Sequence, residues 1–110
     1  ESNITQYIEE ADLIVNTTPI GMNNKKTAQE NIPLGHEVWK NLSNKTILYD
    51  LIYTPRPTSW LKLGQEKNCI TIDGLDMLVH QGALSIKLWS GFNHIPTHIM
   101  KSSAKKHLMV

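Results

Sequence analysis

The stretch that decides the fold is ADLIVNTTPIGM, residues 11–22. Its centre is a short, nearly continuous apolar run of β-forming residues, which is typical of a strand buried on both faces of a parallel sheet. The residues that follow, 17–22, are small and turn-forming, so they can bring backbone close to a ligand. The sequence therefore predicts a strand at 12–17 that ends in a tight turn.

Two more short apolar runs, at 46–53 and 69–72, have the same β-rich character. Helix-sized segments separate the three runs. One, at 33–42, carries apolar side chains at helical spacing, and another is expected to begin after the N-cap residue Thr58 and to stop at Asn68. Strands that alternate with helices predict consecutive β-α units and hence a parallel α/β sheet.

The last third of the chain has a helical pattern. One helix is predicted to open at 73–76 and to end at Gly91. A final amphipathic helix is predicted over 97–107, with Pro96 in its first turn. Four residues at four- and three-residue steps form one stripe of the earlier helix: Met77, Gln81, Leu84 and Leu88.

Three strands are few for a twisted parallel sheet with helices on both faces, which usually has about five or six. We therefore expect an α/β fold: half of a doubly wound Rossmann-type parallel sheet, of about three strands, with flanking and C-terminal helices. A small unusual domain is the alternative. The sequence does not begin with Met, so it is expected to be a piece of a longer protein. Residues 23–31, which have little apolar content, are expected to form an exposed loop.

Composition argues against several classes of partner. The 110 residues carry 11 Lys and Arg against 10 Asp and Glu, a net charge of +1 that supplies no basic face for nucleic acid or a membrane surface. No apolar run approaches the ~20 residues that span a bilayer. The single cysteine, Cys69, allows no internal disulfide, and a cytoplasmic location is expected. His94 and His98 have Pro96 between them and no completing ligand, so no metal site is predicted.

In open parallel sheets, ligands bind beyond the carboxyl ends of the strands. That rule selects the turn at 17–22, the segment 51–55, and residues 73–74, which lead into the next helix. Most candidates there also have a purely structural interpretation, in a turn, at the rim or in the core: Thr18, Gly21, Tyr53, Gly74 and Met77. Gln81 interrupts an apolar stripe, and a buried amide needs a polar partner, either backbone or ligand. Since no nucleophile with its base or carboxylate pair stands out, no catalytic residue is assigned.

Four segments, in order along the chain, resemble motifs of the shikimate dehydrogenases: residues 11–22, 49–55, 73–83 and 88–91. The resemblance implies an NADP-dependent oxidoreductase that interconverts 3-dehydroshikimate and shikimate on the route to aromatic amino acids. It also implies an N-terminal substrate domain and a Rossmann cofactor domain closed by C-terminal helices. Residues 1–110 are then expected to be a partial NAD(P)-binding Rossmann-like domain with those helices.

The resemblance also implies roles for particular residues. Thr18 and Leu51 would line the nicotinamide side of the NADP site, Leu51 chiefly through its backbone. Gly74 would let the backbone approach the nicotinamide, and Met77 would pack on it.

Two more residues are implied to bind the substrate. Tyr53 would hydrogen-bond the carboxylate of shikimate through its phenol, and Gln81 would bond a substrate hydroxyl. A phenol donor and a fixed amide can orient a polyhydroxy acid without becoming charged themselves.

The family's proton-transfer Lys and Asp and its Gly-rich phosphate loop have no counterpart in this sequence, so the chain alone is expected to be inactive and to bind cofactor weakly. Asp76 stands where the family usually has glycine, and Thr54 where Asn is common. Asp76 is expected to bring a negative charge near the cofactor.

Self-association is expected through the uncovered edge of the first strand, or through the helices that carry Trp89 and Phe92. Two other interpretations of the sequence stay open. One is an NAD-dependent quinate/shikimate dehydrogenase. The other is a non-catalytic α/β module for binding or oligomerisation.

Overall fold

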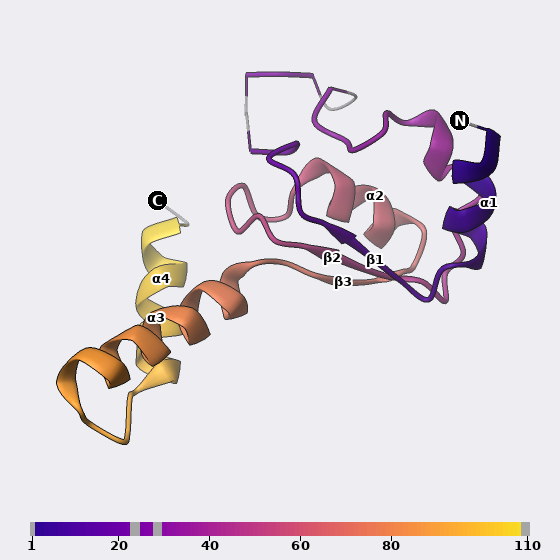
Figure 1. Cartoon of the computed structure of the whole chain (residues 1–110). Coiled ribbons are helices and arrows are strands. Elements are labelled where there is room, and N and C mark those ends of the chain that lie inside the picture. The colour runs from indigo at the N-terminus through magenta and orange to yellow at the C-terminus, as the bar shows by residue number, and fades with distance from the viewer. Residues whose placement is uncertain (1, 23–24, 28–29, 109–110) are drawn as a thin grey trace. The chain divides into compact units, whose positions relative to one another are not determined.

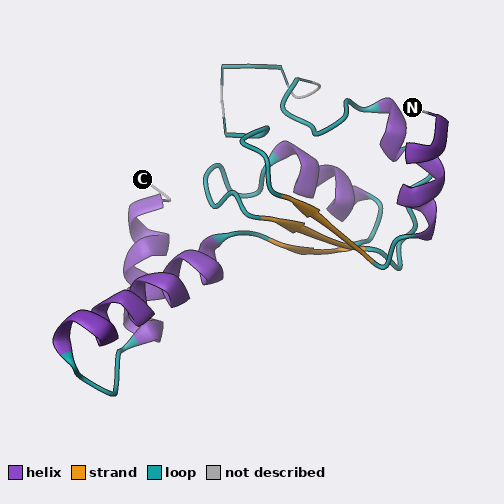
Figure 2. Ribbon diagram, in the orientation of Figure 1, coloured by secondary structure: helices purple, strands orange, loops and turns teal. Residues whose placement is uncertain are grey.

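The computed structural model describes residues 2–22, 25–27 and 30–108. They fall into two compact units, Glu1–Asp73 and Gly74–Val110, and each unit is described by itself. The first unit holds the sheet and the second is a pair of helices, as the colouring by secondary structure makes plain (Figure 2).

The first unit contains a three-stranded parallel sheet in the order β1-β2-β3 (Figure 1). Its strands are β1 (Leu13–Asn16), β2 (Ile47–Asp50) and β3 (Ile70–Ile72). All three predicted strands and the α/β class are thus confirmed, with each strand shorter than its apolar run. In the register of β1 and β2, Asn16 is aligned with Asp50, so the two carboxyl ends are level.

Three helical segments belong to this unit: α1 (Ser2–Glu10), the 3-10 turn η1 (Glu37–Trp39) and α2 (Ser59–Glu66). The start of α2 is as predicted, because the Thr58 hydroxyl accepts a hydrogen bond of 3.3 Å from the Leu61 amide. Helix α1 was not foreseen from the polar sequence at 2–10. The predicted helix at 33–42 is wrong, because Leu34 and Gly35 have φ angles of 63° and 78°, which no right-handed helix accommodates.

The core of this unit lies on one face of the sheet. Ile8 of α1, Trp39 of η1 and Trp60 of α2 are buried in one cluster together with Leu48 of β2. The rings of Trp39 and Trp60 are 5.4 Å apart. Helix α2 can approach β2 closely because Gly64 has no side chain; a Cβ there would meet Leu48 Cδ1 at 2.5 Å. The three helical segments therefore share one core.

The opposite face of the sheet is exposed. Leu13 and Val15 of β1 are 54% and 43% exposed, and Ile70 and Ile72 of β3 are 64% and 38% exposed. Burial on both faces, predicted for the first two strands, is therefore wrong for β1, and Ile47 and Tyr49 on the same face of β2 are half-buried. The reason is that the core residues of α1, η1 and α2 all gather on the other side.

The second unit is a helical hairpin of α3 (Leu75–Ser90) and α4 (Thr97–Leu108). Its predicted limits are confirmed: Gly91 ends α3 with a φ of 75°, and α4 follows Pro96 directly. Helix α3 packs against α4 near Gly82, where a Cβ would lie 3.5 Å from Met100 Cε.

The predicted apolar stripe of α3 is the exposed one. Met77, Leu84 and Leu88 are 44%, 58% and 76% exposed. The buried residues of α3 form a different stripe: Leu75, Val79 and Ala83. The interpretation of Met77 as core filler is therefore wrong.

Part of the predicted loop at 23–31 lies outside the described residues, namely 23–24 and 28–29. Of the rest, residues 25–27 and Glu30 are exposed as expected, whereas Asn31 is buried. Within the described ranges, none of the helices has the length and apolar character needed to cross a bilayer.

Candidate functional site

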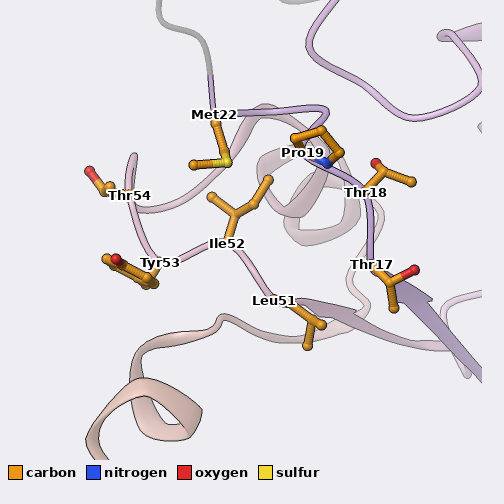
Figure 3. Close-up of a pocket in the computed structure, with 8 residues that line it drawn as sticks. All are labelled: Thr17, Thr18, Pro19, Met22, Leu51, Ile52, Tyr53 and Thr54. Atoms are coloured by element: carbon orange, nitrogen blue, oxygen red, sulfur yellow. The ribbon is translucent and has the colours of Figure 1, made fainter. Parts of the chain in front are cut away.

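The carboxyl ends of β1 and β2 open into a pocket between the two loops that follow these strands (Figure 3). Its volume is about 370 Å³. The lining comes entirely from the two loops: Thr17, Thr18, Pro19, Met22, Leu51, Ile52, Tyr53 and Thr54. The structure thus brings together Thr18, Leu51 and Tyr53, three of the six residues to which the sequence assigns a ligand.

The loop after β1 is shaped by the side chain of Asn16. Its Oδ1 accepts hydrogen bonds from the Thr18 hydroxyl at 2.6 Å and the Thr18 amide at 3.1 Å. Its Nδ2 donates to the Ile20 carbonyl at 3.0 Å. The Thr18 hydroxyl in turn accepts from the Ile20 amide at 3.2 Å. Thr18 is therefore an exposed residue in a fixed orientation, acting as a turn residue while it lines the pocket.

The same loop touches the loop after β2 at Gly21. Gly21 has a φ of 116°, a region that side-chain-bearing residues rarely adopt, and a Cβ there would lie 3.3 Å from Ile52 Cδ1. The Met22 amide donates to the Pro19 carbonyl at 3.1 Å and closes the turn. Figure 3 shows the side chains of Met22 and Ile52 directed toward each other between the loops. Glycine is needed here for both conformation and space.

The loop after β2 is anchored at its first two residues. The Leu51 amide donates to the Asn16 carbonyl at 3.2 Å, and the Ile52 amide donates to Asp50 Oδ1 at 3.1 Å. Ile52 is buried and Tyr53 is half-buried. Tyr53 and Thr18 lie on opposite sides of the view in Figure 3, on different loops. The loops thus present an apolar floor with polar groups on either side.

Asp50 lies behind the pocket and is fully buried. Its carboxylate accepts three hydrogen bonds, from Asn16 Nδ2 at 3.1 Å, the Ile52 amide at 3.1 Å and the Thr58 hydroxyl at 2.8 Å. Burial raises the pKa of Asp50, and the charge of Asp73 acts in the same direction. The three hydrogen bonds oppose that rise by stabilising the charged form.

None of the lining residues carries a carboxylate, an ammonium, a guanidinium or an imidazole. Met22, Leu51 and Ile52 provide apolar contact area, while Thr18 and Tyr53 provide hydroxyl groups. This combination suits a flat ring with a polar substituent. It can bind and orient such a group, but it offers no strong acid or base for proton transfer at neutral pH.

The other three assigned residues belong to the second unit. Gly74 is buried and precedes the first residue of α3, and its carbonyl accepts from the Leu78 amide at 3.0 Å. Met77 and Gln81 are four positions apart on α3, so they share one face of that helix, and both are exposed. An exposed Gln81 needs no protein partner for its amide, and it is available for a ligand.

The charge that Asp76 was expected to bring is paired. Asp76 Oδ1 lies 2.7 Å from Lys101 Nζ, across the α3–α4 hairpin. The hydrogen bond from Lys101 holds the pKa of Asp76 below its ordinary value, with a smaller contribution from the charge of His80. The Asp76 carboxylate thus forms a partly exposed ion pair between α3 and α4.

Three residues of the site were missed in the sequence: Asn16, Asp50 and Thr58. The signal was present, because Asn16 and Asp50 are polar residues that end apolar strands, and such residues must find buried partners if they stay in the sheet. Elsewhere in the described part of the chain, no group of three or more His, Cys, Asp and Glu residues could hold a metal ion.

Comparison with known proteins agrees with the resemblance seen in the sequence. Residues 74–105 match the family model described as the shikimate 5'-dehydrogenase C-terminal domain. A shikimate dehydrogenase (NADP(+)) of Prochlorococcus marinus strain MIT 9301 is 52% identical over 107 residues, which cover 96% of this chain and 37% of that protein. The chain therefore spans little more than a third of the length of this curated relative.

Solved structures give the same result. A crystal structure of a shikimate dehydrogenase in complex with NADP+ has a TM-score of 0.73 and 33% identity, covering 88% of this chain and 32% of the other. The Thermus thermophilus enzyme in complex with NADP(H) and shikimate has a TM-score of 0.75 and 29% identity, covering 93% and 36%. The fold, the order of the motifs and these matches show that the chain belongs to the shikimate dehydrogenase family, as a C-terminal part of its members.

Proposed function

We propose that this chain forms the nicotinamide and substrate side of an NADP-dependent shikimate dehydrogenase, which reduces 3-dehydroshikimate to shikimate in aromatic amino-acid biosynthesis. In this proposal, residues 1–110 act as a partial NAD(P)-binding Rossmann-like domain with C-terminal helices. The observation that carries the proposal is the pocket at the carboxyl ends of β1 and β2, where parallel sheets bind their ligands. The names of the similar proteins support the choice of reaction and cofactor.

We assign four residues to the cofactor: Thr18 and Leu51 in the first unit, and Gly74 and Met77 in the second. When bound, NADPH supplies the hydride. Thr18 and the backbone of Leu51 would hold the nicotinamide ring, and the buried side chain of Ile52 would help to exclude water from it. Gly74 would allow close approach of the backbone to the ring, and the exposed thioether of Met77 would pack on it.

We assign two residues to the substrate: Tyr53 in the first unit and Gln81 in the second. The Tyr53 phenol donates to the substrate carboxylate, and the Gln81 amide bonds a ring hydroxyl. Both side chains remain neutral, so they orient the substrate without taking part in proton transfer. Their contribution is therefore expected in the KM for shikimate more than in kcat.

Proton transfer and pyrophosphate binding are assigned to groups outside these 110 residues. The pocket supports this assignment because its lining includes no strong acid or base. The chain alone is accordingly expected to be inactive, and to bind the nicotinamide end of NADP weakly.

The test is a chimera in which these residues replace the matching C-terminal part of the Prochlorococcus relative. Oxidation of shikimate with NADP, followed by the absorbance of NADPH, is expected at a rate within about tenfold of the intact relative. The isolated 110-residue chain is expected to give no turnover. A chimera that folds but binds neither shikimate nor NADP would contradict the proposal. A clear preference for quinate with NAD would instead indicate an NAD-dependent quinate/shikimate dehydrogenase.

Self-association of the isolated chain is part of the same proposal. Strand β1 is at an edge of the three-stranded sheet, and its residues Leu13 and Val15 are also exposed on one face. Trp89 and Phe92, on or beside α3, are 83% and 70% exposed. Light scattering is expected to show a mass that rises with concentration; a monomer mass at every concentration would contradict this. A cytoplasmic location fits the one cysteine, Cys69, a buried free thiol.

A further inference from the structure

The two walls of the pocket are tied together behind it by side chains that do not line it. Asn16 ends β1, Asp50 ends β2, and the two are aligned in the sheet. Asn16 Nδ2 lies 3.1 Å from Asp50 Oδ1, a buried hydrogen bond between residues 34 positions apart in sequence. This bond joins the carboxyl ends of two strands at the place where each strand gives way to its loop.

Each member of this pair also holds its own loop. Asn16 binds the first loop through the amide and hydroxyl of Thr18 and through the Ile20 carbonyl. Asp50 binds the second loop through the Ile52 amide. A shift of either side chain would therefore move one wall of the pocket relative to the other.

Thr58 adds a third segment to the junction. Its hydroxyl donates to Asp50 Oδ2 at 2.8 Å and accepts from the Leu61 amide at 3.3 Å, so the first turn of α2 is fixed to the same carboxylate. Thr58 is fully buried and makes no part of the pocket lining. Thr58 can therefore act on the pocket through its hydrogen bond to Asp50 and through its side chain beside Gly21, where a Cβ would lie 3.9 Å from Thr58 Cβ.

The chemistry of Asp50 suits a positioning role. A fully buried carboxylate without a cation among its hydrogen-bond partners is costly, and an apolar side chain would be the cheaper way to fill the space. Only a carboxylate, however, offers two oxygen atoms that can accept from three donors at once. An Asn in its place would direct an NH2 group at one of those donors.

We propose that Asp50 is a positioning residue of the dehydrogenase site. Through Asn16 it holds the loop that carries Thr18, and through the Ile52 amide it holds the loop that carries Tyr53. Asp50 thereby fixes the width of the pocket in which the nicotinamide ring lies. This inference rests on the proposed function for its ligand. The hydrogen-bonded junction itself does not, and the two can be tested separately.

The first test needs only the 110-residue chain. Amide hydrogen exchange is measured by NMR in the wild type and in Asp50→Asn. In the variant the Ile52 amide loses its carboxylate acceptor, and Asn16 Oδ1, which accepts from the Thr18 amide, loses the bond from Asn16 Nδ2 to Asp50 that positions it. Both amides are therefore expected to exchange about tenfold faster, beyond any change at Leu48 in the middle of β2. Equal acceleration at Leu48, Thr18 and Ile52, or no acceleration at either loop, would overturn the proposal.

Thr46→Val is the matched control. Thr46 is also buried on the sheet, and its hydroxyl donates to the Ala11 carbonyl at 2.8 Å, but at the opposite, amino end of β2. This variant is expected to leave the exchange of Thr18 and Ile52 unchanged relative to Leu48. If Asp50→Asn fails to fold, Thr58→Val replaces it under the same criterion, with Thr58→Ser expected to restore the wild-type exchange.

The second test uses the chimera. Thr58→Val is expected to lower kcat on the order of tenfold while the KM for NADP changes by less than about twofold, because a misplaced ring reacts slowly even when the rest of the cofactor is bound. Thr58→Ser is expected to restore kcat, and Thr46→Val to leave it unchanged. Equal losses in Thr58→Val and Thr46→Val would overturn the positioning role. An inactive wild-type chimera would instead refute the proposed function and leave the exchange result to decide on the junction.

Discussion

The two ends of the sheet are built differently. At the amino end of β2, a single neutral hydrogen bond joins Thr46 to the Ala11 carbonyl. At the carboxyl end, a buried carboxylate accepts three hydrogen bonds and joins two strands, two loops and a helix. Burying a carboxylate costs far more free energy than burying a hydroxyl. The difference indicates that the carboxyl end is organised for the geometry of its pocket, and the amino end only for cohesion.

The largest expected effect comes from removing the carboxylate. Asp50→Ala leaves the Nδ2 of Asn16, the Ile52 amide and the Thr58 hydroxyl buried without their acceptor. We expect the free energy of unfolding to fall by about 3 kcal/mol or more. Urea denaturation of the wild type and the variant measures this, and a loss below about 1 kcal/mol would mean that water or rearrangement satisfies the three donors.

The second effect concerns the contact between the loops. Gly21→Ala places a Cβ against Ile52 at a φ of 116° and is expected to cost about 1–3 kcal/mol. Gly35→Ala is the control, since Gly35 also has a positive φ, 78°, but a Cβ there meets nothing within 4 Å. The difference between the two variants measures the crowding at Ile52 together with the greater strain of a side chain at a φ of 116°. Equal losses would show that the loops are not in close contact.

At the amino end, a smaller effect is expected. Thr46→Val removes one buried neutral hydrogen bond and is expected to cost about 1 kcal/mol of unfolding free energy. If Thr46→Val lowers the unfolding free energy as much as Asp50→Ala does in the same urea measurement, the two ends of the sheet do not differ in the way described.

The pH dependence gives a subtler test of the carboxyl end. Because the pKa of Asp50 is raised in the folded state, the folded protein binds its proton more tightly than the unfolded chain does. The contribution of Asp50 is therefore most favourable below its ordinary pKa of 3.8 and is lost as pH rises through the higher folded value. Asp50→Asn cannot titrate, so the stability of the wild type relative to this variant is expected to increase as pH falls toward 3.8. Parallel stability curves for the two proteins would contradict a raised pKa.

The smallest effect is expected away from the sheet. Asp76→Asn breaks the ion pair with Lys101 on a half-exposed surface of the hairpin and is expected to cost less than about 0.5 kcal/mol. Thermal unfolding of the wild type and the variant should nearly coincide, and a large shift would show that this pair is important to the hairpin.

The sequence predicted the elements that depend on local signals. The three strands follow from β-rich apolar runs, the start of α2 from the Thr58 N-cap, and the end of α3 from Gly91. The segment at 33–42 was mispredicted because its apolar spacing suits a helix, while Leu34 and Gly35 adopt left-handed conformations that spacing does not reveal.

Other errors arose from tertiary contacts. Two stripes of α3 are apolar enough to be buried, and the stripe of Leu75, Val79 and Ala83 is the buried one. Nothing in the periodicity of α3 distinguishes the two. Similarly, apolar residues on both faces of β1 and β2 could not show which face the helices cover.

The pocket was only partly predictable. The rule that ligands bind beyond the carboxyl ends of strands selected the two loops, which the structure brings together. The junction of Asn16 and Asp50 depends on the register of two strands, which a single sequence does not fix.

The central claim is that the loops after β1 and β2 form a nicotinamide site. The most direct measurement is a titration of the isotope-labelled 110-residue chain with nicotinamide mononucleotide, observed by amide NMR. The ligand is added to millimolar concentration, because a small fragment in a partial site is expected to bind with a Kd of about 1 mM. We predict chemical-shift changes at residues 17–22 and 51–54 that saturate together, with little change near Thr46 at the other end of the sheet. Shifts confined to other parts of the chain, or none at either loop, would contradict the claim.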